Sequence, residues 1–176
     1  MNQKAWDEIE KLYDLPHVPK STIDAFRMLK SREPSHTKGE GALRHYCSFF
    51  LPYDKEQGKI YLGHHKKAGD WIPPGGHIDP GETPSDAAIR EMQEELKTEI
   101  TLADLTAWNL SVKEINKEVQ GCQAHYDVWH LVNLKEQPFD FLRKEYHDAG
   151  WFSITEGVAK IAKNPDFAKI ITQLFS

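Results

Sequence analysis

Cysteine is scarce in this sequence, which holds only Cys47 and Cys122 in 176 residues. The two cysteines lie far apart along the chain and fit no metal-ligand spacing, so their placement does not indicate a metal centre. We therefore expect both to be reduced, buried thiols, the usual state of free cysteine in a folded protein. A reducing cytoplasm is the simplest location for such a chain.

Two further absences exclude classes of partner. No apolar run approaches the ~20 residues that span a bilayer, and residues 1–10 lack the apolar core of a signal peptide. The sequence therefore predicts no membrane partner. An excess of basic residues is missing as well, because the formal net charge is −5. Long nucleic acid is not an expected partner, since its binding depends on clustered positive charge.

The sequence does contain an ordinary globular composition, 39% hydrophobic and 28% charged, in a length that suits a single buried core. A polar segment at 31–41 separates a helical N-terminal extension at 1–40 from a domain at 41–176. Strand and helix signals are interspersed in that domain, which predicts an α+β fold with mixed strands flanked by helices. The expected strands lie at 45–51, 59–65, within 101–119, at 124–134 and at 150–152, and the expected helices begin at 153–156 and at 164–165.

The most informative stretch, residues 76–95, predicts a helix with a well-defined start. Thr83 is a good N-cap, and Pro84 suits the first helical position. Asp86 completes a variant of the capping box. A helix should therefore begin directly after a Pro-Pro-Gly-Gly turn.

This helix carries three glutamates on one face, which repel one another at this spacing and destabilise the helix. One arginine, Arg90, cannot neutralise all three. A solvated acidic face is the alternative interpretation, but a broken local rule is typical of a functional site. The preceding glycine turn and Glu82 favour a site for a divalent cation. The three glutamates are Glu91, Glu94 and Glu95, and the apolar stripe of the helix consists of Ala88, Ile89, Met92 and Leu96.

The spacing of Gly76, Glu82 and the run Arg90–Glu95 resembles the signature of the Nudix hydrolase family, which would span residues 76–98. The pattern departs at Lys97–Thr98, where the family has glycine followed by an apolar residue. That glycine normally ends the helix in a left-handed conformation. The departure therefore concerns the end of the helix, while the carboxylates are intact. The resemblance implies an α/β/α sandwich.

The resemblance also implies Mg²⁺, or alternatively Mn²⁺, as cofactor. Glu91, Glu94 and Glu95 would supply the oxygen ligands that Mg²⁺ prefers, together with the backbone carbonyl of Gly76. Such an ion neutralises a diphosphate and lowers the pKa of a bound water. The general base would be Glu94 or an acid on a later loop, for which Glu145 is the best placed candidate; a plain surface glutamate is the alternative for Glu145.

Other residues have predicted roles around these carboxylates. Arg90 would orient the glutamates through charge-assisted hydrogen bonds. Lys66 and Lys67 would meet phosphate, or else form an ordinary basic loop. His77 would hydrogen-bond a phosphate or the leaving group. Trp129 would stack on a base or sugar, with ordinary sheet packing as the alternative.

These residues together predict a Mg²⁺-dependent hydrolase that splits the diphosphate of a nucleoside diphosphate linked to another moiety, a small nucleotide-type substrate. Two alternatives remain. Isopentenyl diphosphate isomerases are similar around Gly76–His77 and Arg90–Glu91, but they carry a catalytic cysteine where this chain has Pro73–Gly75. The second alternative is a binding module on the same scaffold without catalytic activity, and the intact glutamates argue against it. The N-terminal extension could pack across a two-fold interface in a homodimer.

Overall fold

The computed structural model describes residues 1–33, 35–115, 122–161 and 163–175. Contacts along the chain divide it into two compact units, each assembled from three segments. Helix α3 and strands β1, β5 and β6 run from one unit into the other. The first unit comprises Met1–Phe49, Gly76–Ala88 and Ala107–His130, and the second comprises Phe50–Gly75, Ile89–Thr106 and Leu131–Ser176.

The described residues form a seven-stranded sheet flanked by helices, as the predicted α+β class requires. Five strands follow the order β3-β2-β1-β6-β5, while β4 pairs with β1 and β7 pairs with β2. No helix in the described part of the chain is long and apolar enough to cross a membrane. The strands are β1 (Arg44–Asp54), β2 (Lys59–His65), β3 (Asp70–Ile72), β4 (Gly75–His77), β5 (Leu105–Glu114), β6 (Ala124–Asn133) and β7 (Tyr146–Ser153), and the helices are α1 (Gln3–Lys11), α2 (Lys20–Arg32), α3 (Pro84–Leu96), α5 (Ile154–Lys160) and α6 (Pro165–Thr172).

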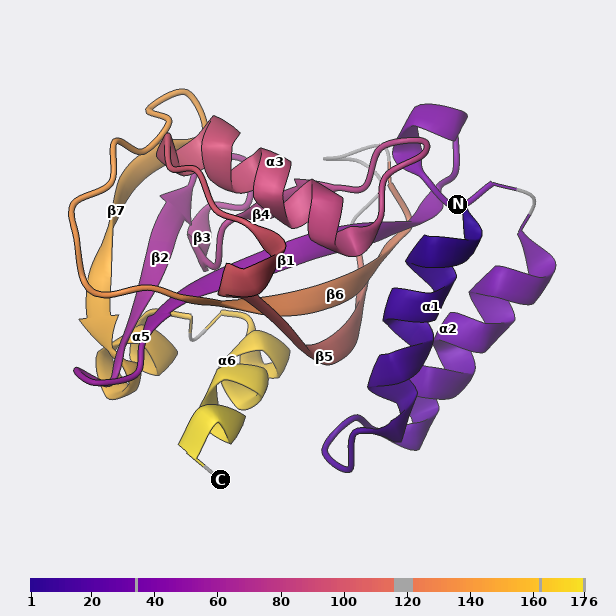
Figure 1. The fold of residues 1–176 in the computed structure, drawn as a ribbon, viewed down its shortest axis with the longest axis horizontal. Helices are drawn as coiled ribbons and strands as arrows, with labels where there is room; N and C mark the ends of the chain where they lie inside the picture. The colour runs from indigo at the N-terminus through magenta and orange to yellow at the C-terminus, as the bar shows by residue number, and fades with distance from the viewer. Residues whose placement is uncertain (34, 116–121, 162, 176) are drawn as a thin grey trace. The chain divides into compact units, whose positions relative to one another are not determined.

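In the first unit, α1 and α2 lie side by side (Figure 1) and share one hydrophobic core with the strands. The Asn2 side chain accepts the Ala5 N–H at 2.9 Å and so caps α1. Helix α2 begins after Pro19, as expected for a residue without a backbone N–H. The predicted helices of the N-terminal segment are therefore present, while the domain boundary at residue 41 stays a prediction. The shared core includes Trp6, Ile9, Phe26, Leu29, Tyr46, Leu110, Tyr126 and Val128.

In the second unit, β2 pairs antiparallel with β7 on one side and with β3 on the other. Ser153 and Glu156 form the predicted capping box at the start of α5. Gly157 brings α5 close to β2, because a Cβ there would lie 2.6 Å from Ile60 Cδ1. Helix α6 begins at Pro165, as predicted, and buries Phe167, Ile170 and Ile171.

The hairpin predicted between β1 and β2 is confirmed, but β1 is longer than expected. It continues through Pro52 to Asp54, because the ladder with β2 closes only at Asp54↔Lys59. The Asp54 carboxylate then accepts the N–H groups of Glu56 and Gln57 at 3.0 Å and fixes the turn. It also accepts the Glu136 N–H at 2.7 Å, which ties the chain after β6 to this turn.

One other strand prediction needs correction. The last strand, β7, begins at Tyr146 and not at residue 150, because its pairing with β2 extends back to His65↔Tyr146. Within 101–115 there is one strand, β5, and the remaining predicted positions 116–119 lie outside the described residues.

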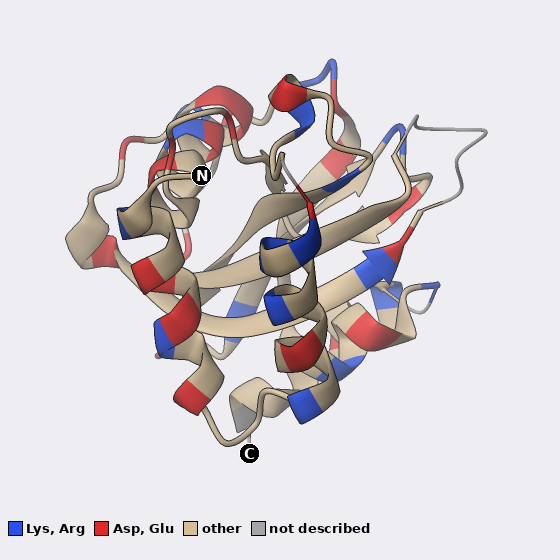
Figure 2. Cartoon of the chain, turned by 90° about the vertical axis from the view of Figure 1, so that its right-hand side faces the viewer, with Lys and Arg blue, Asp and Glu red and all other residues tan. Residues whose placement is uncertain are grey.

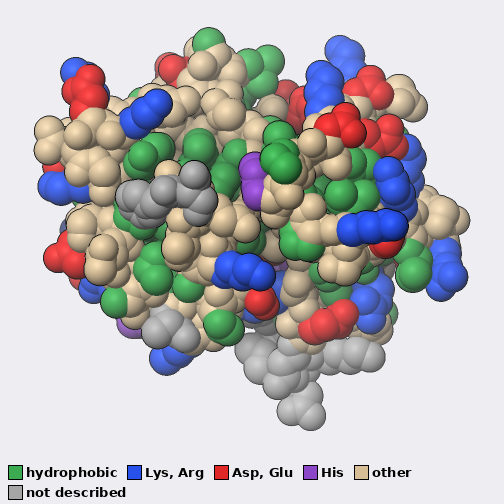
Figure 3. Space-filling view, turned by 90° about the horizontal axis from the view of Figure 1, so that it is seen from below, with side chains coloured by type: hydrophobic (Ala, Val, Ile, Leu, Met, Phe, Trp, Pro, Cys, Tyr) green, Lys and Arg blue, Asp and Glu red, His purple; other side chains and the backbone are tan. Residues whose placement is uncertain are grey.

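Charge is mixed over the molecule. Figure 2 shows acidic and basic residues interspersed along the helices and loops. The face in Figure 3 likewise combines hydrophobic side chains with charges of both signs.

Candidate active site

Helix α3 begins as the sequence predicts. Thr83 Oγ1 accepts the Asp86 N–H at 3.1 Å, and the Asp86 carboxylate accepts the Thr83 N–H at 3.0 Å. Pro84 is the first residue of the helix. A second carboxylate, from Glu8, accepts the Ser85 N–H at 3.0 Å. Carboxylates at this end stabilise the helix, because they accept hydrogen bonds from its first N–H groups and interact favourably with the positive end of the helix dipole.

Helix α3 ends at Leu96, where the family's helix is expected to end. Lys97 has a φ of 53°, the left-handed conformation that glycine adopts more readily. Its ammonium donates to the Glu94 carbonyl at 2.8 Å and so satisfies one of the last carbonyls of the helix. This lysine therefore occupies the glycine position of the signature without changing where the helix ends.

Glu95 lies at the centre of the carboxylate cluster and is only 5% exposed. Its Oε2 accepts two hydrogen bonds, from the Gly75 N–H at 3.0 Å and from the Tyr146 hydroxyl at 2.8 Å. The Leu142 N–H also donates to the Glu95 carbonyl at 2.7 Å. The end of α3 is therefore tied to the glycine turn and to the start of β7.

Burial, together with the charge of Glu91, raises the pKa of Glu95 to about 8. The hydrogen bonds from Tyr146 and Gly75 act in the opposite direction, because they favour the ionised form. Desolvation and like charge both penalise an ionised Glu95. A cation bound beside these carboxylates would offset both effects.

Arg90 engages two of the three glutamates. Its guanidinium lies 2.8 Å from Glu91 Oε1 and 3.8 Å from Glu94 Oε2. The side chain of Glu91 is 13% exposed and that of Glu94 is 58% exposed, so the cluster runs from the interior to solvent. This geometry suits the predicted orienting role of Arg90.

Glu145 lies close to the carboxylates of α3, since its charge is one of those that raise the pKa of Glu95. Its Oε2 lies 3.7 Å from His65 Nε2 and 3.5 Å from Lys67 Nζ. The backbone carbonyl of Glu145 accepts the Lys66 N–H at 2.8 Å. The loop of lysines therefore borders the candidate site, and the Lys66 ammonium donates to the Arg143 carbonyl.

Gly76, His77 and Trp129 belong to the first unit. Trp129 is fully buried, stacks on Phe49 with ring centroids 5.4 Å apart, and donates from Nε1 to Ser111 Oγ at 2.9 Å. The prediction that Trp129 stacks on a base or sugar is wrong for this structure, because neither ring face is open. Ordinary sheet packing, the alternative, is what the structure shows.

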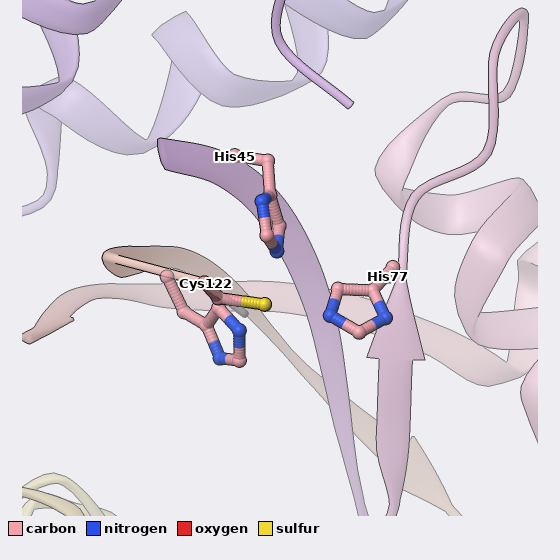
Figure 4. A group of neighbouring side chains, drawn as sticks. His45, His77 and Cys122 are labelled. Atoms are coloured by element: carbon pink, nitrogen blue, oxygen red, sulfur yellow. The ribbon is translucent and has the colours of Figure 1, made fainter. Parts of the chain in front are cut away.

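His77 lies in a group of side chains that could hold a metal ion and that no sequence motif indicated. Its ring centroid is 4.8 Å from that of His45 and 5.3 Å from that of His125. Figure 4 shows His45, His77 and the Cys122 sulfur directed toward one another. One ligand atom from each of the four residues lies within 4.8 Å of all the others.

Both cysteines are buried and outside any disulfide bond, as predicted. Cys47 and Cys122 form no metal-ligand spacing with each other, but a histidine can complete such a spacing. Cys122 and His125 are three residues apart, a separation that is common between zinc ligands. The pair Cys122 and His125 is therefore the part of this group that the sequence alone could indicate. His45 and His77 come from distant parts of the chain, so no short spacing connects them to this pair.

The comparisons with known proteins agree with the fold and the signature. The NUDIX domain model matches residues 44–174. A bis(5'-nucleosyl)-tetraphosphatase [asymmetrical] of Caenorhabditis elegans is 31% identical over 127 residues, 68% of this chain and 86% of that protein. The CTP pyrophosphohydrolase of Escherichia coli (strain K12) is 32% identical over 84 residues, 46% of this chain and 58% of that protein.

Solved structures show the same fold. The E. coli dihydroneopterin triphosphate pyrophosphohydrolase aligns with a TM-score of 0.63 at 20% identity, over 73% of this chain and 92% of that chain. The chain therefore belongs to the Nudix family, as a Nudix-type pyrophosphohydrolase. Use of a divalent metal ion is general in this family.

Proposed function

We propose that the chain hydrolyses the diphosphate linkage of a nucleoside diphosphate joined to another moiety, with Mg²⁺ or Mn²⁺ as cofactor. The observation that carries the proposal is Glu95, a buried carboxylate of raised pKa beside Glu91. This arrangement is unfavourable for carboxylates alone and favourable around a dication. Relatives named as a bis(5'-nucleosyl)-tetraphosphatase and a CTP pyrophosphohydrolase support a nucleotide substrate.

The ion would be held by Glu91, Glu94 and Glu95, with the Gly76 carbonyl as a further ligand. An all-oxygen donor set suits Mg²⁺, which binds through a few carboxylates and the phosphates of its substrate. When bound, the ion supplies charge neutralisation for the diphosphate and a more acidic water.

The chain's own residues prepare this site. The Gly75 N–H and the Tyr146 hydroxyl hold one oxygen of Glu95 in place, which leaves Oε1 for a ligand. Arg90 fixes Glu91 through a 2.8 Å contact and does not need to touch the substrate. Lys66, whose ammonium donates to the Arg143 carbonyl, is our proposed phosphate contact.

The general base is Glu94 or Glu145. The Glu94 side chain is open to solvent and 3.8 Å from Arg90, so it can reach a water outside the buried cluster. Glu145 is less exposed than Glu94, and its Oε2 lies 3.7 Å from His65 Nε2 and 3.5 Å from Lys67 Nζ. Replacing the true base with glutamine should lower kcat by ~10²- to 10⁴-fold, and replacing the other should have a smaller effect.

The experiment is a phosphate-release assay on nucleoside triphosphates, nucleotide sugars, ADP-ribose and dinucleoside polyphosphates, with and without Mg²⁺. Glu95→Gln keeps the shape and both hydrogen bonds but removes the charge, so it should abolish turnover while the protein stays folded. Hydrolysis in ¹⁸O-labelled water should place the label on a phosphate product. Full activity in excess chelator, or wild-type turnover by Glu95→Gln, would overturn the proposal.

A further inference from the structure

We propose that His45, His77, Cys122 and His125 form a Zn²⁺ site in the first unit, distinct in ligands and chemistry from the glutamates of α3. His45 lies on β1, His77 on β4 and His125 on β6. Cys122 lies two residues before β6 begins at Ala124. Three imidazoles and one thiolate are a donor set that zinc favours, whereas Mg²⁺ prefers oxygen.

The spacing of the ligand atoms is close to what zinc requires. Tetrahedral zinc with Zn–N near 2.0 Å and Zn–S near 2.3 Å places three nitrogens and one sulfur roughly 3.3 to 3.6 Å apart. The four candidate atoms all lie within 4.8 Å of one another. Small side-chain rotations would therefore close the group around an ion, and Figure 4 shows that the labelled side chains already converge.

His45 is already prepared as a ligand. Its Nδ1 lies 2.8 Å from the Ala42 carbonyl, which can only accept, so Nδ1 must carry the proton. The Nε2 atom then holds a lone pair, and it is buried without a hydrogen-bond partner among the described residues. A backbone carbonyl that fixes the tautomer of a histidine in this way is a regular feature of zinc sites.

His125 provides a second buried nitrogen of the same kind. Its Nε2 is also buried and has no hydrogen-bond partner in the described part of the chain. Buried polar atoms without partners are rare in native proteins, because each one loses its hydration without compensation. Two of them within one group of potential ligands point to an ion as the missing partner.

The surroundings offer negative charge to balance the ion. A second set of potential ligands, Cys47, His125 and Asp127, shares His125 with the first. Asp127 is fully buried, and its Oδ1 lacks a hydrogen-bond partner among the described residues. The Asp127 carboxylate and the Cys122 thiolate together balance the two charges of Zn²⁺. This matters because Lys38 and Lys113 also bring positive charge close to His125.

Four protein ligands leave no open position, which is typical of a structural zinc site. The ion would join β1, β4 and the beginning of β6 within one unit. His77 directly follows Gly76, so the ion would also fix the backbone of the turn that carries this glycine. The site would therefore stabilise the fold and would take no part in hydrolysis.

The test is a titration of the purified, chelator-stripped protein with Zn²⁺, and with Co²⁺ as a spectroscopic substitute. Wild type should bind one Zn²⁺ per chain, melt at a higher temperature with Zn²⁺ present, and show the absorption of tetrahedral Co²⁺–thiolate. Cys122→Ser should lose the thiolate band and weaken Zn²⁺ binding by more than about 100-fold, since even outer-shell partners of zinc ligands contribute 10- to 100-fold.

Two control variants locate the ion. Cys47→Ser should keep the thiolate band, because Cys47 is not one of the four ligands. Glu95→Gln should keep the same Zn²⁺ stoichiometry, because the α3 glutamates are not involved. Wild-type protein without a Co²⁺–thiolate band, a band lost in Cys47→Ser but kept in Cys122→Ser, or Zn²⁺ binding that disappears with Glu95→Gln would each overturn the proposal.

Discussion

Glu95 combines two properties that are separate in most proteins. It is buried beside the core residue Leu96, with 5% of its surface exposed against 1% for Leu96, yet it carries an ionisable group with two hydrogen bonds to a single oxygen. Because those bonds come from Gly75 and Tyr146, the position of this carboxylate is set by parts of the chain 20 and 51 residues away. Its role depends on the tertiary fold as well as on its place in the signature.

His130 is a second buried ionisable residue. Its pKa predicts how the free energy of unfolding changes on acidification. Burial lowers the pKa of His130 to about 4, and a hydrogen bond with the Phe49 backbone opposes this only in part. The unfolded chain binds a proton near pH 6.5, so it binds more protons than the native chain between pH 4 and 6.5. The free energy of unfolding should therefore fall by roughly 3 kcal/mol on acidification through this range because of His130 alone.

Urea denaturation at pH 7, 6, 5 and 4.5 checks this prediction. His130→Gln removes the titrating group, so its stability should decline less steeply with acid than that of wild type. The matched control is His147→Gln, because His147 is exposed. Parallel curves for wild type and His130→Gln would show that His130 is protonated as easily in the folded protein as in the unfolded one.

At the scale of elements, the end of α3 gives a prediction about backbone strain. Lys97 is left-handed, a conformation that costs a residue with a Cβ roughly 1 kcal/mol relative to glycine. Lys97→Gly should raise the melting temperature by roughly 2 to 4 °C. Lys97→Ala separates the two contributions, because it keeps the strain and loses only the bond to the Glu94 carbonyl. A lower melting temperature for Lys97→Gly would mean that this bond outweighs the strain.

The pairing of β2 with β7 gives a second prediction. A Cβ on Gly63 would lie 2.3 Å from two ring atoms of Tyr146, the residue that holds Glu95. Gly63→Ala should therefore displace Tyr146, destabilise the protein by about 1 to 3 kcal/mol and lower activity by at least about 10-fold.

The matched control for this strand pair is Gly150→Ala, since the nearest atom to its added Cβ is 3.7 Å away. That variant should keep both its melting temperature and its activity. Equal activity in the two variants would show that the position of Tyr146 does not matter for catalysis.

Some features of the helices and strands can be predicted from the sequence, and others cannot. Local signals were enough for the start of α3, because capping at Thr83 depends on near neighbours. They left the end of α3 open at Lys97, whose left-handed conformation is seen only in the structure. They were not enough for the burial of Glu95, the fully buried Trp129 or the convergence of His45 with Cys122. Each of these depends on contacts between segments far apart in the chain, which periodicity and spacing do not encode.

At the scale of the whole molecule, the N-terminal helices give a prediction about domain organisation. Phe26 on α2 is fully buried, with its ring 5.4 Å from the rings of Tyr46 and Tyr126. Phe26→Ala should reduce the free energy of unfolding by about 3 to 5 kcal/mol. Met28→Ala, at a position that is 49% exposed, should change it by less than about 0.5 kcal/mol.

Urea denaturation of the two variants decides whether residues 1–40 are an accessory extension. A loss of under about 1 kcal/mol for Phe26→Ala would mean that α2 adds little to the core and that the domain begins near residue 41, as the sequence suggests. The larger loss would mean that the N-terminal helices are needed for the stability of the family domain.

The connection from β6 to β7 is held at both ends. The Asp54 carboxylate binds the Glu136 N–H, and the Glu95 carbonyl binds the Leu142 N–H. Between these anchors, the exposed Pro138 and Asp140 can be exchanged without moving the carboxylate that the second anchor supports. The two anchors therefore allow the exposed positions of this connection to vary in sequence while its ends keep their places.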